Sequence, residues 1–146
     1  MDSRLIITAP FVAYLAILGL FAIAQSAAGA TFSDGQPVFL LVVGVLCPLF
    51  AFGLIWMRNY RYGPPLLIAT LLPNGWFVSY FFFVHDNSAN VFAVSGDGAL
   101  AYTTATAGIV LMSLIVIVVA GWLWYHESSR FRTAVDGFIR PDAVDQ

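Results

Sequence analysis

The chain has 146 residues, of which 60% are hydrophobic and only 10% are charged. Soluble domains carry roughly 25% charged residues, and a soluble domain of this length could not bury so much apolar side chain. With a mean hydropathy of +0.86, the composition excludes an ordinary soluble protein and indicates an integral membrane protein.

Charged residues are absent from four long stretches of the chain, at 5–33, 35–57, 62–85 and 98–126. Because a helix needs roughly 20 apolar residues to cross the hydrocarbon core, each stretch can hold one span. We predict spans near 5–27, 37–57, 64–84 and 101–125. Apolar runs such as 114–120 do not alternate with polar residues as barrel strands do. The predicted fold is therefore an all-α membrane protein, with a four-helix transmembrane bundle over 1–126 and an inner-side tail over 127–146.

The first span has features of a secretory signal peptide. Arg4 precedes the apolar stretch, and Ala28-Gly29-Ala30 resembles a cleavage site. The apolar region of a signal peptide usually has about 7–15 residues, and this one is longer. We therefore expect the span to be retained as an anchor; cleavage would leave three spans and the same inner C-terminus.

The second span contains Cys47, the only cysteine, so no disulfide can form within the chain. We expect Cys47 to be a small buried side chain. Pro48 in this span and Pro10 in the first are weak signals for kinks.

The third span contains Leu72-Pro73-Asn74-Gly75. Proline removes a helical hydrogen bond and glycine loosens the same turn, and the Asn74 amide then lies near the middle of the membrane. One interpretation is a broken helix that lines a solute or ion path. The other is a kink whose freed carbonyl bonds to Asn74 or to a neighbouring helix. We favour the kink, because transporters pair broken helices across repeats and no second such element is present.

The fourth span follows the longest connection, 85–100. The apolar centre of this connection, Val91, Phe92 and Val94, would lie on the membrane or contact a partner, and we favour an ordinary interfacial loop. Within the span, small residues recur at four-residue spacing, as Ala101/Ala105 and Thr104/Gly108. This spacing permits close packing within the bundle and equally permits an oligomer.

In the tail, Phe131, Val135, Phe138 and Ile139 fall near one helical face. That pattern predicts a short amphipathic helix in the membrane interface. The tail has three arginines against four acids, Glu127, Asp136, Asp142 and Asp145. This charge balance does not favour binding to phosphate, so we expect no specific nucleic-acid binding.

The basic residues predict the orientation of the bundle. All six are arginines, at Arg4, Arg58, Arg61, Arg130, Arg132 and Arg140. With four spans, the N-terminus, the loop 58–63 and the tail share one side, and every arginine lies there. The loops 28–36 and 85–100 carry aspartates and no basic residue. The positive-inside rule therefore predicts both termini on the inner side, N-in and C-in.

No constellation of catalytic or ligating residues is evident. His85 and His126 belong to opposite edges of the membrane, roughly 30 Å apart, so they cannot share a metal ion or a haem iron. No acidic or basic residue lies inside a span, although proton relays and most ion-coupled carriers need one. We therefore expect no catalytic, cofactor-binding or metal-binding residue, no cofactor and no enzymatic activity.

The balance of charged residue types suggests an origin. The chain has no lysine, and seven of its eight acids are aspartate. This is typical of haloarchaeal proteins, whose surface carboxylates keep them soluble in concentrated salt; GC-rich codon usage in another prokaryote is the alternative. A lysine-free, aspartate-biased chain with four spans and inner arginines resembles the small internal membrane protein of haloarchaeal pleomorphic viruses. The resemblance covers the whole chain and assigns no functional residue.

The resemblance implies a structural protein of a virion envelope, beside a spike protein and with little exposed outside. The expected partners are then the lipid bilayer, a spike or other envelope protein, and further copies of the chain. The alternative is a small accessory subunit of a prokaryotic respiratory or transport complex in the membrane. A carrier or channel is the less favoured third function.

Overall fold

The computed structural model describes residues 2–141, which are helical and contain no strand. Four helices in this part are long and apolar enough to cross a membrane, namely Ser3–Ala28, Gly35–Trp56, Gly63–Val84 and Ala99–Glu127. They confirm the four predicted spans, with ends that differ from the prediction by no more than two residues. The chain is thus a multi-pass membrane protein by the length and composition of its helices.

Two of the spans are not uniform α-helices. The first is α1 (Ser3–Ala28), and the fourth is α5 (Ala99–Glu127), followed by a short α6 (Ser129–Ile139). The second span is α2 (Gly35–Leu41), a π-helical turn η1 (Val42–Leu46) and α3 (Cys47–Trp56). The third is α4 (Gly63–Ser79) and a π-helical turn η2 (Tyr80–Val84). The π turns were not predicted; in each, a backbone N–H bonds to the carbonyl five residues earlier, from Cys47 to Val42 and from His85 to Tyr80.

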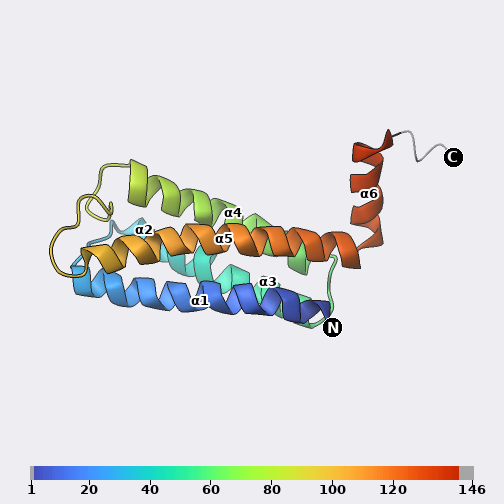
Figure 1. Ribbon diagram of the computed structural model, residues 1–146, viewed down its shortest axis with the longest axis horizontal. Helices are drawn as coiled ribbons and strands as arrows, with labels where there is room; N and C mark the ends of the chain where they lie inside the picture. Colours follow the sequence, from blue (N-terminus) through green and yellow to red (C-terminus); the bar gives the residue numbers. More distant parts are fainter. Residues whose placement is uncertain (1, 142–146) are drawn as a thin grey trace.

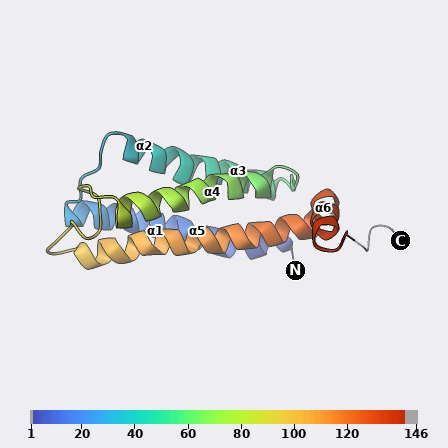
Figure 2. The same ribbon diagram turned by 90° about the horizontal axis from the view of Figure 1, so that it is seen from above.

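The helices form an elongated bundle in which α5 packs against both α1 and α4, and α4 packs against α3 (Figures 1 and 2). Stacked rings close the bundle between the first and second spans, where the centroids of Phe11 and Phe52 lie 4.4 Å apart. The order around the bundle is therefore α1, α5, α4 and the second span.

Both ends of the described chain lie at the same end of the bundle. Figure 1 places the N-terminus, the connection between α3 and α4, and α6 together, with α6 turned across the long axis. We call this the arginine end (residues 2–4, 57–62 and 127–141), because it carries all six arginines. The connections 29–34 and 85–98 form the opposite end, the loop end.

Two glycines let neighbouring helices approach closely. A Cβ on Gly63 would lie 2.7 Å from Ile55 Cγ1 and 2.9 Å from the Ile55 nitrogen, which joins α4 to α3. A Cβ on Gly108 would lie 3.1 Å from Ile17 Cγ2, which joins α5 to α1. Small residues at helix contacts are how membrane helices gain packing where water supplies no driving force.

Large apolar side chains cover the outside of the bundle. Leu20, Ile23 and Val118 are 60%, 69% and 70% exposed, whereas Tyr14 and Asn74 in the interior are fully buried. A soluble protein rarely leaves so much apolar surface in water. The outward-facing apolar surface is suited to contact with lipid tails.

Candidate functional site

The motif Pro73-Asn74-Gly75 lies at the centre of the bundle in a continuous helix. α4 runs from Gly63 to Ser79 through Pro73, so the broken helix that would line a solute path is not present. The Asn74 side chain donates from Nδ2 to the Tyr14 hydroxyl at 3.0 Å. The Asn74 amide thus bonds to a neighbouring helix and not to the carbonyl freed by Pro73, so the predicted partner of that carbonyl stays a prediction.

Tyr14 accepts the hydrogen bond from Asn74 and donates a second one to the second span. Its hydroxyl donates to the carbonyl oxygen of Gly44 at 2.7 Å. Pro48 has no N–H to offer to that carbonyl, which lies four residues earlier in the chain. Gly44 belongs to the π turn η1, so local rearrangement and a tyrosine from α1 together compensate for the proline.

The same region brings together a residue from each span: Tyr14, Gly44, Asn74 and Ser113. A Cβ on Gly44 would lie only 2.8 Å from Asn74 Oδ1, and one on Gly75 would lie 3.7 Å from Ser113 Cβ. Asn74 Oδ1 and Ser113 Oγ are buried and have no hydrogen-bond partner within residues 2–141. We call these four residues the polar core; its hydrogen bonds and close contacts hold the four spans in position relative to one another.

Of this polar core, the sequence singled out Asn74 alone. Tyr14 and Ser113 sit within apolar runs that give no sign of a polar partner. Pro48 was noted only as a kink signal, although it also identifies the carbonyl of Gly44 as an available acceptor.

The two histidines lie at opposite ends of the bundle. His85 follows η2 at the loop end, where its ring stacks on Tyr80 at a centroid distance of 5.6 Å. His126 is in the last turn of α5, 4.3 Å from the Trp122 ring centroid. Within residues 2–141, no three side chains of the metal-ligating types come together.

Cys47 is a free thiol at the start of α3 and is half-buried. The side chain was expected to be buried, and it is only partly buried. Cys47 lies next to Pro48, which faces the interior, and successive residues of a helix point in different directions.

The connection 85–98 is folded onto the loop end. Asn87 donates from Nδ2 to the Phe81 carbonyl at 2.6 Å, and the Tyr102 hydroxyl donates to the Ala89 carbonyl at 2.6 Å. The predicted apolar centre is only partly formed, since Val91 is buried but Phe92 is 79% exposed. Turns built by asparagine side chains orient Val91 and Phe92. The hydropathy pattern alone did not reveal these turns.

The arginine end is tied together across three helices. Arg4 Nε donates to both carboxylate oxygens of Asp2, at 3.0 and 2.9 Å, and Arg4 Nη1 donates to the Trp56 carbonyl at 2.9 Å. Ser3 Oγ donates to Glu127 Oε1 at 2.5 Å, which joins the start of α1 to the end of α5. The hydrogen bonds from the Arg4 side chain and backbone amide lower the pKa of the Asp2 carboxyl to about 2.

The helix α6 confirms the short helix expected in the tail and is held by contacts to the end of α5. The Phe131 ring stacks on Trp124 at 3.8 Å between centroids, and the Tyr125 hydroxyl donates to Asp136 Oδ1 at 2.8 Å. Arg132 Nε donates to the Tyr125 carbonyl at 3.2 Å. Phe138, in contrast, is 89% exposed, so part of the predicted apolar face is left free for the membrane interface.

An apolar groove of about 740 Å³ runs between α1 and α5. Small side chains line it, among them Ala24, Ala101, Ala105 and Gly108. These include both small-residue pairs noted in the fourth span. The small residues thus lie at the α1–α5 contact and also open a furrow on the outer surface of the bundle.

No family model matches the sequence. No curated protein and no solved structure matches it significantly either. The resemblance to virion envelope proteins therefore rests on architecture and composition.

Proposed function

We propose that this chain is a non-enzymatic structural protein of a virion envelope of an archaeal virus, with its arginine end on the interior side. The observation that carries the proposal is the unequal construction of the two ends. The arginine end holds both ends of the described chain, all six arginines and α6 (Figure 1). The loop end holds two connections, and the longer one is hydrogen-bonded back onto the bundle.

Charge supports the same orientation. Basic residues in short loops are retained on the cytoplasmic side of a membrane, and the interior of a particle that buds from a cell corresponds to that side. In this orientation the outer surface consists of short connections with aspartates and no basic residue. An internal envelope protein with little exposed outside has this form.

Trypsin provides a direct test, because the chain has no lysine and every arginine lies at the arginine end. Intact enveloped particles treated with trypsin should keep the chain whole, and particles opened with detergent should lose it. The control is Asp97→Arg, which adds a cleavage site at the exposed loop end and should be cut in intact particles. Cleavage of the unmodified chain in intact particles would instead show that the arginine end faces outward.

The particle itself is the second readout. The chain should copurify with enveloped particles and with their spike protein through a density gradient. Stoichiometric purification with a cellular oxidase or transporter would instead favour an accessory subunit. The groove between α1 and α5 favours that alternative, because its small side chains would let a helix of another subunit approach closely. Solute flux through the purified protein in liposomes would favour a carrier or channel.

A further inference from the structure

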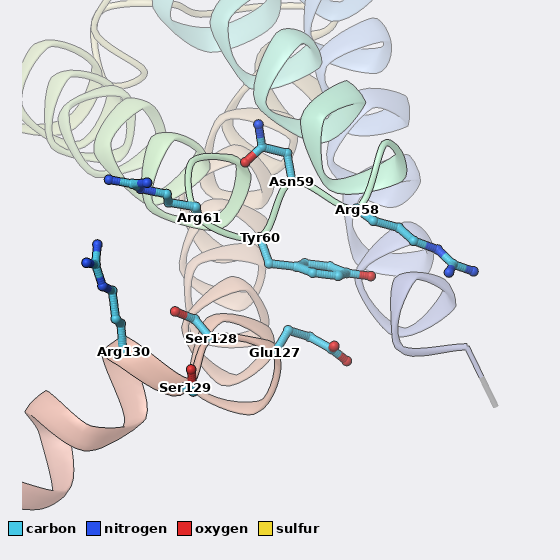
Figure 3. A pocket seen from close by; sticks show the side chains of 8 residues that line it. All are labelled: Arg58, Asn59, Tyr60, Arg61, Glu127, Ser128, Ser129 and Arg130. Atoms are coloured by element: carbon cyan, nitrogen blue, oxygen red, sulfur yellow. The ribbon is translucent and has the colours of Figure 1, made fainter.

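A second recess lies at the arginine end, between the connection 57–62 and the start of α6. It has a volume of about 430 Å³ and is lined entirely by polar residues, three of them arginines. Figure 3 shows these side chains from close by. The recess lies directly beyond the ends of the second and third spans, at Trp56 and Gly63. It is therefore at the level where the headgroups of a bilayer begin.

Two of the arginines face the same side of the recess. Arg61 comes from the connection and Arg130 from the first turn of α6, and their guanidinium groups lie on one side in Figure 3. Arg58 points away from them beyond Tyr60, toward the side on which Glu127 lies. The recess is thus divided into a side with two arginines and a side with one arginine and one carboxylate.

The charges of Arg61 and Arg130 are not matched by an acid in the described chain. Among residues 2–141 the single ion pair is the one between Arg4 and Asp2. Arg61 is steadied by the Tyr62 ring, whose centroid lies 5.2 Å from its guanidinium carbon. Two like charges held near one another repel unless an anion lies between them.

We propose that Arg61 and Arg130 bind a phosphate group, supplied by the headgroup of an anionic phospholipid in the leaflet at the arginine end. The planar guanidinium fork matches the oxygens of phosphate. The start of α6, at Ser128 and Ser129, also lines the recess, and a helix N-terminus carries a partial positive charge. Basic recesses between transmembrane helices at the inner surface of a membrane bind such headgroups. The proposal holds for a virion envelope and for a cell membrane alike.

The test uses the purified full-length protein in a neutral detergent. Native mass spectrometry measures binding of dioctanoyl phosphatidylglycerol, with dioctanoyl phosphatidylcholine as the uncharged reference lipid. The double variant Arg61→Gln/Arg130→Gln removes the site, and Arg58→Gln/Arg140→Gln removes the same charge from the same end. We expect the first variant to bind phosphatidylglycerol about tenfold more weakly than the unmodified chain. The second should bind within about threefold of it.

Helix content and unfolding temperature without lipid, which must agree among the three proteins, control for folding. Equal weakening in both double variants would overturn the proposal, because general electrostatic attraction would then account for binding. Failure of the unmodified chain to prefer phosphatidylglycerol over phosphatidylcholine would also overturn it, unless inorganic phosphate binds with the same dependence on Arg61 and Arg130. In that case the phosphate site stands and its ligand is a soluble anion. Preference for a short oligonucleotide over the lipid would overturn the lipid assignment.

Discussion

The amide nitrogen of Asn74 lies 3.0 Å from the hydroxyl oxygen of Tyr14, and this bond joins the first and third spans in the middle of the bundle. The same hydroxyl donates to the Gly44 carbonyl at 2.7 Å. One oxygen atom thus connects three spans, and it does so where no water competes for the groups involved.

Replacing Tyr14 with phenylalanine should destabilise the bundle by about 1–3 kcal/mol, because a buried donor and a buried acceptor lose their partner. Hydrogen bonds between membrane helices average about 0.6 kcal/mol and reach about 1.7, so a value near the lower limit is expected. Reversible unfolding in mixed micelles with increasing SDS measures the difference. Tyr80→Phe is the control, since Tyr80 lies partly exposed on the third span, and should change stability by less than about 0.5 kcal/mol. Equal stability of Tyr14→Phe and the unmodified chain would show that the bond contributes nothing.

A methyl group at residue 44 should be poorly tolerated. It would lie 2.8 Å from Asn74 Oδ1, and Asn74 is itself held by Tyr14. We expect Gly44→Ala to cost about 1–3 kcal/mol, as overpacking of a filled interior does. Gly53→Ala in the same span is the matched control, because nothing lies within 4 Å of its added methyl. The control should be neutral or more stable by about 0.5–1 kcal/mol, since alanine is the better helix former. A similar effect of both substitutions would contradict the close contact.

The spans were predictable because a bilayer imposes them. Charge is excluded from the hydrocarbon core, so the charge-free stretches located the four spans, and the ends of the predicted spans agree with the helices to within two residues. The bond between Tyr14 and Asn74 was not predictable in this way. It depends on the rotation of α1 and α4 about their axes, which is set by close approaches such as those at Gly63 and Gly108.

At the arginine end, too, the sequence predicted which residues lie together but not how their side chains are arranged. The sequence predicted that all six arginines would lie on one side, and they do lie at one end of the bundle. It did not predict that Arg61 and Arg130 would share one side of a recess while Arg58 points away (Figure 3). That division follows from the turn after α3, where Arg58 takes the left-handed backbone conformation with φ of 61°. Arginine at such a position carries no sequence signal, because glycine is the usual residue there.

The pair formed by Asp2 and Arg4 should make the N-terminal turn sensitive to acid. Hydrogen bonds from Arg4 lower the pKa of Asp2 from 3.8 to about 2, so its carboxylate favours the folded state. A depressed pKa means that this contribution is complete above about pH 4 and is lost as the pH falls toward 2. Carbon-13 NMR of the Asp2 carboxyl in micelles should show the low pKa, and Arg4→Gln should raise it toward the ordinary value. An ordinary pKa in the unmodified chain would contradict the pair. Asp2→Asn, which keeps a helix-capping oxygen but does not titrate, should lose the corresponding part of the pH dependence of stability.

The attachment of α6 should depend on one ring rather than on the helix as a whole. Phe131 stacks on Trp124 with an angle of 3° between the rings, whereas Phe138 on the same helix is 89% exposed. Phe131→Ala should therefore release α6, and trypsin should cut more rapidly after Arg130 and Arg132 in micelles. The loss of a stacked aromatic pair, about 0.5–1.5 kcal/mol beyond the area it buries, corresponds to a severalfold faster cleavage when opening limits access. Phe138→Ala leaves every contact between α6 and α5 in place, so its cleavage rate should match that of the unmodified chain. If Phe138→Ala accelerated cleavage as strongly as Phe131→Ala, the membrane interface rather than Trp124 would hold α6 in position.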